Sequence, residues 1–102
     1  MMRIMKMELG KPMPDIVKDA SNRKFVYKKL SFNIKDDLYL YQIRYKSSGL
    51  IIDVIMNSSE ALWLMSFNDE TYRKKFERAL DIAFISFVRT SENFYKKTKE
   101  EK

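Results

Sequence analysis

The sequence lacks the two side chains that most often carry acid–base and nucleophilic chemistry near neutral pH. It contains no histidine and no cysteine, which excludes a Ser-His-Asp triad, a Cys-His pair, an H-E-x-x-H zinc site and metal clusters held by thiolates. Any reaction would have to use Asp, Glu, Lys, Tyr or Ser alone. We therefore predict that the chain is not an enzyme and that it uses no cofactor, no bound metal and no small-molecule substrate.

One carboxylate stands out, because Asp53 interrupts an otherwise apolar segment. A buried carboxylate is costly unless it is paired, and a metal-dependent phosphodiesterase would need a second acid nearby. The candidates for that second acid are Asp15, Asp19, Asp36 and Glu60. Pro14-Asp15 fits the start of the PD…(D/E)xK nuclease pattern, but no (D/E)-x-K follows on a predicted strand. We interpret Asp53 as an outward-facing residue that discourages edge-to-edge strand pairing.

Tyrosine is concentrated in the middle of the chain, at Tyr27, Tyr39, Tyr41 and Tyr45. Tyrosine combines a large apolar area with a hydroxyl group and is enriched at protein interfaces. The alternative is that these rings pack inside the domain with their hydroxyls at the surface. The pattern favours a non-enzymatic module that binds a protein or peptide partner through these residues, and a second copy of the chain is one such partner.

A basic cluster surrounds Phe25 and Tyr27 and consists of Arg23, Lys24, Lys28 and Lys29. The net charge is +6, and the whole excess lies in residues 1–50, which hold 11 basic and 5 acidic side chains (11 − 5 = +6). Cations interleaved with aromatic rings are typical of nucleic-acid binding, which is the alternative function. Residues 23–27 loosely resemble an RNA-recognition-motif signature but lack both of its glycines. The structural alternative is that the segment is an edge strand whose lysines prevent pairing with the strand of another chain.

The elements that position these side chains belong to one domain, residues 1–102, of the α+β class. We expect a small antiparallel sheet packed by a long C-terminal helix. Alternating apolar residues predict strands over residues 2–9 and 24–34, with a bulge or bend near Lys28-Lys29. Residues 15–22 fit either a short helix or an ordered loop.

Residues 35–46 are ambiguous, because alternating tyrosines favour a strand whereas Asn33 could cap a helix there. Leu50–Met56 and Ala61–Phe67 are apolar runs that predict two strands joined by a hairpin loop. A helix follows, with Asn68 as its cap, and continues to about residue 89 or 96. Its predicted core stripe is Tyr72, Phe76, Ala79, Leu80, Ala83 and Phe87.

The tripeptide Ser-Phe-Asn occurs twice, at residues 31–33 and 66–68. If residues 35–46 are helical, each half of the chain becomes a strand-strand-helix unit. This alternative divides the domain into repeats 2–49 and 50–96, followed by a charged tail at 97–102.

No segment reaches the roughly 18 uninterrupted apolar residues of a membrane span, and the first residues lack the apolar block of a signal peptide. In its short length, its Met, Ile, Lys and Tyr usage and its lack of Cys and His, the chain resembles the orphan proteins of crenarchaeal filamentous viruses of the Acidianus type. That resemblance implies a viral accessory protein that acts in the host cytoplasm or in the virion.

Overall fold

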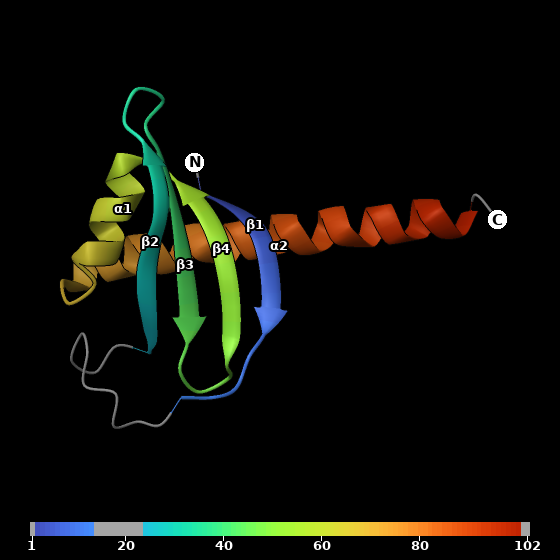
Figure 1. Ribbon diagram of the computed structural model, residues 1–102, viewed down its shortest axis with the longest axis horizontal. Coiled ribbons are helices and arrows are strands. Elements are labelled where there is room, and N and C mark those ends of the chain that lie inside the picture. The colour runs from blue at the N-terminus through green and yellow to red at the C-terminus, as the bar shows by residue number, and fades with distance from the viewer. Residues whose placement is uncertain (1, 14–23, 101–102) are drawn as a thin grey trace.

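The computed structural model describes residues 2–13 and 24–100, with side chains up to residue 91. The predicted α+β class is confirmed: four antiparallel strands form one sheet, and two helices pack on it (Figure 1). The elements are β1 (Arg3–Leu9), β2 (Phe25–Asn33), β3 (Leu38–Tyr45), β4 (Leu50–Met56), α1 (Ser58–Met65) and α2 (Glu70–Glu100). The strand order is β1-β4-β3-β2, so β1 and β2 are the two edges.

The sheet has one covered face and one open face, and β4 shows why. Alternate residues of a strand point to opposite faces, and Ile52, Val54 and Met56 are completely buried on the face that carries the helices. Ile51 and Asp53 alternate with them on the open face and are only partly buried. Since β4 lies between β1 and β3, its apolar character fits a central strand.

The long helix is confirmed, and so is its predicted core stripe except for Tyr72, which lies outside the core. Phe76, Leu80 and Ala83 are buried against the sheet. The carboxylate of Asp69 accepts hydrogen bonds from the backbone N–H groups of Thr71 (2.9 Å) and Tyr72 (3.4 Å). Asp69, and not Asn68, therefore caps α2. Figure 1 shows that α2 crosses behind the sheet and continues well beyond β1.

The predicted bulge in β2 is confirmed close to its expected place. The pairing of β2 with β3 shifts register between Lys29 and Ser31, which leaves Leu30 as the extra residue. A bulge bends the strand and increases its twist. The shift explains why the apolar residues of β2 change parity along the strand.

The ambiguous segment 35–46 holds a strand and not a helix, since β3 covers Leu38–Tyr45 and residues 35–37 belong to the turn before it. Asn33 caps a hairpin turn: its amide donates to Asp36 Oδ2 (2.9 Å), and its Oδ1 accepts from the Asp36 backbone N–H (3.2 Å). Asp37 then takes a positive φ of 54°, a conformation that asparagine and aspartate tolerate better than most residues. The chain reverses there, and β3 follows along β2.

The predicted strand at residues 61–67 and the hairpin loop before it are wrong. Asn57 and Glu60 form a capping box, in which each side chain accepts a hydrogen bond of 2.9 Å from the other's backbone N–H. This motif begins α1 at Ser58. Ala61 and Leu64 then turn inward at helical spacing.

The element order does not support two equal repeats. Within the described residues, the segment 2–49 holds three strands, whereas 50–96 holds one strand and two helices. The proposed strand-strand-helix unit required a helix at 35–46, where β3 lies. The short helix considered for residues 15–22 lies outside the described residues.

Candidate functional site

The four tyrosines predicted to bind a partner lie on the helix-covered side of the sheet. Tyr39, Tyr41 and Tyr45 alternate along β3 on the same side as the fully buried Ile43, and Tyr27 of β2 pairs with Ile43 in register. The rings of Tyr27 and Tyr41 meet edge to face, with centroids 6.1 Å apart. The tyrosines therefore start from the core side of the sheet, and only some of them reach its rim.

Tyr45 belongs to the packing between the sheet and α2. Its ring centroid lies 5.7 Å from that of Phe25 and 6.4 Å from that of Phe84. Burial raises the pKa of Tyr45 to about 12, and the negative charges of Asp81 and Glu77 act in the same direction. This tyrosine is therefore neutral across the physiological range and is held between the layers.

Tyr39 and Tyr41, by contrast, reach a groove between the sheet and α1. We call this feature the tyrosine groove; its volume is about 390 Å³. It is lined by Lys29 of β2, Tyr39 and Tyr41 of β3, and Ser58, Ser59, Ala61, Leu62 and Met65 at and within α1. Two of the four predicted tyrosines and one of the predicted basic residues therefore meet at one place.

The groove combines exposed apolar surface with one positive charge. Leu62 and Met65 are 49% and 50% exposed, although both are apolar residues of a packed helix. The ammonium of Lys29 lies 4.8 Å from the centre of the Phe32 ring, which holds it at the rim by a cation–π contact. The residues that line the groove include no acidic side chain.

The hydroxyl of Tyr41 acts as a neutral hydrogen-bonding group. Burial raises the pKa of Tyr41 above its ordinary value, and the neighbouring Tyr27 and Tyr39 act in the same direction. A neutral phenol can both donate and accept a hydrogen bond. It can therefore orient a polar group of a ligand without adding charge to the groove.

Beside the groove, β2 forms an edge of the sheet. Within the described residues β2 pairs only with β3, so its other side presents backbone N–H and C=O groups without a strand partner. Leu30 at the bulge and Phe32 are 41% and 56% exposed. Apolar side chains and an unpaired strand edge therefore adjoin one another.

The predicted nucleic-acid cluster is divided between the two faces of the sheet. Lys29 lies at the tyrosine groove, whereas Lys28 pairs in register with Gln42, and Gln42 pairs with Asp53, on the open face. Lys24 precedes β2 and is exposed, and Arg23 lies outside the described residues. Neighbouring residues of a strand point to opposite sides, so the adjacent Lys28 and Lys29 start on different faces of the sheet.

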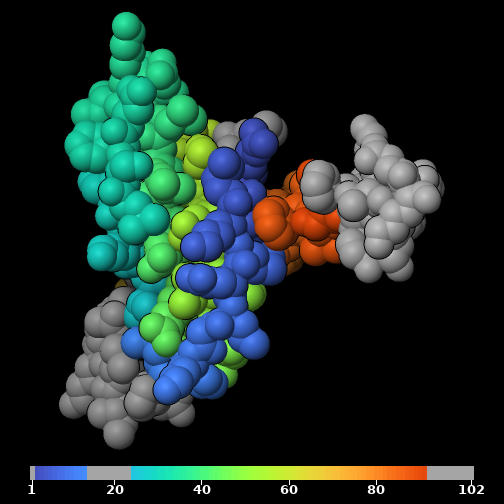
Figure 2. Space-filling view, turned by 45° about the vertical axis from the view of Figure 1, so that its right-hand side comes forward, coloured from blue at the N-terminus to red at the C-terminus, as the bar shows by residue number. Residues whose placement is uncertain are grey.

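The open face carries four cations, Arg3, Lys6, Lys28 and Arg44, together with Glu8 and Asp53. Figure 2 shows the strands side by side, with α2 projecting past β1. Lys6 lies 3.8 Å from Glu8, and the Arg44 guanidinium donates to the Lys11 carbonyl at 2.6 Å. Two of these four cations therefore already have a partner within the chain.

The acidic residues considered for metal chemistry do not converge in the part of the chain that the structure describes. Asp53 accepts a long hydrogen bond of 3.4 Å from Gln42, Glu60 belongs to the capping box, and Asp36 belongs to the β2–β3 turn. No group of three or more acidic residues that could hold a metal ion occurs among the described residues. Asp15 and Asp19 lie outside them.

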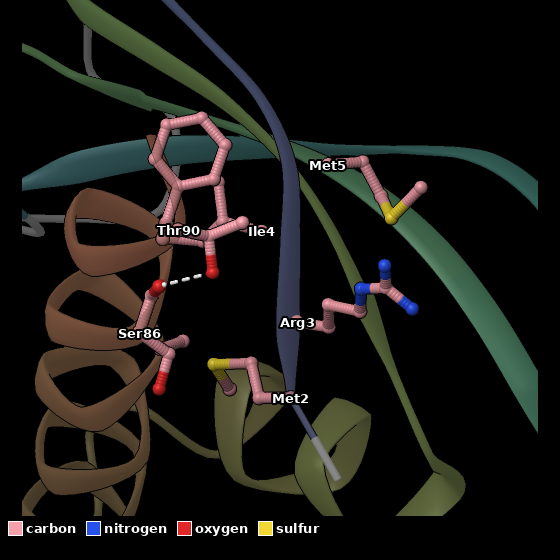
Figure 3. Close-up of a pocket in the computed structure, with 8 residues that line it drawn as sticks. Met2, Arg3, Ile4, Met5, Ser86 and Thr90 are labelled. Carbon is pink, nitrogen blue, oxygen red and sulfur yellow. Dashed lines mark hydrogen bonds between the residues drawn. The ribbon is translucent and has the colours of Figure 1, made fainter. Parts of the chain in front are cut away.

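A second hollow of about 510 Å³ lies between β1 and α2. Figure 3 shows that Met2 and Ile4 point from β1 toward the helix, whereas Arg3 and Met5 point away from it. The Thr90 hydroxyl donates to the Ser86 backbone carbonyl at 2.9 Å within the helix. The hollow is thus mainly apolar, and its one charged lining residue, Arg3, turns away from it.

Sequence reasoning missed Leu62 and Met65, because they were assigned to a strand. The signal was present in the Asn57-x-x-Glu60 capping box, which predicts a helix and places residues three apart on one side of it. A scan of protein-family models finds no match to this chain, and searches of curated proteins and of solved structures find none either. None of the helices among the described residues has the length and apolar character that crossing a membrane requires.

Proposed function

We propose that this protein is a non-enzymatic binding module and that the tyrosine groove holds an extended peptide segment of a partner protein. The observation that carries the proposal is the meeting of half-exposed Leu62 and Met65 with Tyr39 and Tyr41 beside an unpaired sheet edge. Exposed apolar side chains gathered in a hollow mark binding surfaces in soluble proteins.

The groove also favours one kind of peptide. An extended segment could align with β2 and satisfy its backbone groups, while alternate side chains enter the groove. The Lys29 ammonium, with no acid among the lining residues, favours an acidic side chain in that segment. The ligand we propose is therefore an extended segment with apolar residues and at least one Asp or Glu.

A role as a viral accessory protein, which the compositional resemblance implies, is compatible with such a module and remains a proposal. Nucleic-acid binding through the basic first half is the alternative. The start of Lys28 and Lys29 on opposite faces of the sheet favours the peptide-binding proposal over that alternative, because the basic residues are not gathered on one face.

The test is a selection from a phage-displayed library of random linear peptides, followed by fluorescence anisotropy with the selected peptides. We expect them to contain acidic and apolar residues, and Met65→Ser to weaken binding about tenfold. Met5→Ser is the matched control, since Met5 is exposed to the same extent (49%) but lies on β1. Lys29→Glu should weaken the binding of acidic peptides.

Two results would contradict the proposal. The first is equal binding by the Met65 and Met5 variants, which would place the site elsewhere. The second is binding of a single-stranded oligonucleotide whose affinity falls steeply with salt and depends on Lys28, which would favour the alternative function. Circular dichroism of each variant separates loss of binding from loss of folding.

A further inference from the structure

A second unexplained surface lies on the outer side of α2, turned away from the sheet. Six of the seven residues in the segment 82–88 are apolar, so the helix there is apolar nearly all round. One side packs in the core, but Ile82, Ile85 and Val88 on the other side are 59%, 53% and 46% exposed. A helix that is apolar all round is ordinarily buried all round. In the single chain, one side of this apolar segment is therefore exposed to solvent.

The exposed residues form two rows that cross at Ile85. Ile82 and Val88 lie three residues before and after it, and Asp81 and Arg89 lie four residues before and after it. Residues three and four apart are neighbours on a helix surface and form the ridges by which helices pack together. An apolar ridge and a charged ridge therefore share one centre.

This pattern is complementary to itself. In an antiparallel pair of α2 helices with a two-fold axis at Ile85, every residue faces the one equally far on the other side of the axis. Ile82 then faces Val88 of the second copy, and Asp81 faces Arg89 of the second copy, twice in each dimer. A parallel pair would instead place Asp81 against Asp81.

The charged residues are available for such contacts. Asp81 and Arg89 are both exposed, and neither takes part in any of the ion pairs between described residues, which join Lys6 to Glu8 and Glu70 to Arg73 and Lys74. The sheet covers the core side of α2 (Figure 1), and Asp81 lies at the border of the exposed residues, where its negative charge still acts on Tyr45. Two copies can therefore approach helix to helix with both sheets on the outside.

We propose that the chain forms an antiparallel homodimer through the α2 stripe, which consists of Asp81, Ile82, Ile85, Val88 and Arg89. The occupant is a second copy, because the stripe satisfies the symmetry of a two-fold interface in both its apolar and its charged residues. The inference is independent of the tyrosine groove, which lies between the sheet and α1.

Single engineered thiols test the register directly, because the chain has no cysteine of its own. Ile85→Cys lies on the proposed axis and should cross-link to itself under mild oxidation. In Ile82→Cys the two thiols would be offset by about 9 Å along the helices, which is beyond disulfide reach. A mixture of Ile82→Cys and Val88→Cys should cross-link faster than either variant alone.

Charge reversal tests the contacts without changing the apolar stripe. Asp81→Arg and Arg89→Asp each place like charges face to face and should weaken the dimer about tenfold or more in sedimentation velocity. An equimolar mixture of the two variants, and the double variant D81R/R89D, should each restore a dimer of wild-type strength. The loss in the single variants should shrink in high salt, which screens exposed charges.

The wild type is measured up to about 100 μM, because helix pairs of this size associate weakly. A wild type that remains monomeric there overturns the proposal. Self-cross-linking of Ile82→Cys as fast as that of Ile85→Cys overturns it as well, as does failure of the mixed charge variants to associate. Peptide binding by monomeric Asp81→Arg is measured in parallel, so that failure of the dimer is distinguishable from failure of the groove.

Discussion

At the scale of single residues, three phenylalanines join the two layers of the molecule. Phe25 of β2 lies 4.7 Å from Phe67 and 5.8 Å from Phe76 of α2, measured between ring centroids. Phe67 and Phe76 meet nearly at right angles, at 6.3 Å. Edge-to-face pairs of this kind add stability beyond the area that they bury. The junction of β2 with α2 therefore depends on this cluster.

Phe76→Ala should lower the free energy of unfolding by about 3–5 kcal/mol, because a completely buried ring is replaced by a cavity. Phe87→Ala is the control on the same helix, since Phe87 is only partly buried beside the β1 hollow. We expect a clearly smaller loss there. Urea unfolding followed by circular dichroism gives both values. Equal losses would show that Phe76 contributes no more to stability than a partly buried ring does.

At the scale of elements, α1 depends on its first turn. It has only eight residues, and isolated helices of that length are unstable in water. The capping box at Asn57 and Glu60 satisfies two backbone N–H groups, and Asp37 of the β2–β3 turn accepts from the Ser58 backbone N–H at 3.1 Å. Interactions at its N-terminus thus tie the helix to the sheet.

Asn57→Ala should lower the free energy of unfolding by about 1 kcal/mol, the usual effect of removing a cap. Ser59→Ala is the comparison within the same turn, because Ser59 is exposed and its side chain takes no part in the capping box. Its effect should stay within a few tenths of a kcal/mol. Thermal or urea unfolding of both variants decides the matter; similar losses would mean that the capping box contributes little.

The elements differ in how well their residues predict them. The core side of α2, with Phe76, Leu80 and Ala83, follows from helical periodicity, and β4 follows from its apolar run. The run at 61–67 is short and apolar, and periodicity alone cannot separate a strand from a buried helix there. The capping box distinguishes the two, but its residues, Asn57 and Glu60, lie before the apolar run.

The candidate site was predictable only in part, for a geometric reason. The tyrosines and lysines were identified by type, but alternation along β2 and β3 decides which of them share a surface. Lys28 and Lys29 separate for this reason, whereas Lys29 joins Tyr39 and Tyr41 at the groove. The other half of the groove comes from α1, so the site could not be assembled before that helix was recognised.

At the scale of the whole molecule, the fold is two layers joined along a seam in which Tyr45 is central. It touches Phe25 within the sheet and Phe84 on α2. A charged phenolate there would lose hydration and would be repelled by the negative charges of Asp81 and Glu77. The seam therefore tolerates the neutral form of Tyr45 and opposes the charged form.

Because the seam opposes the charged form of Tyr45, the free energy of unfolding should decrease at alkaline pH. The pKa of Tyr45 is about 12 in the folded protein and about 10 in an unfolded chain. The contribution of neutral Tyr45 to the free energy of unfolding is fully present below pH 10. It is lost as the pH rises toward 12, by about 1.4 kcal/mol per pH unit.

Tyr45→Phe cannot ionise, so its free energy of unfolding should fall less steeply than that of the wild type between pH 10 and 11. Urea unfolding at pH 8, 10 and 11 measures the difference, and every other ionisable group is common to both proteins. Parallel profiles for the two proteins would mean that Tyr45 ionises without strain and that the seam is open to water.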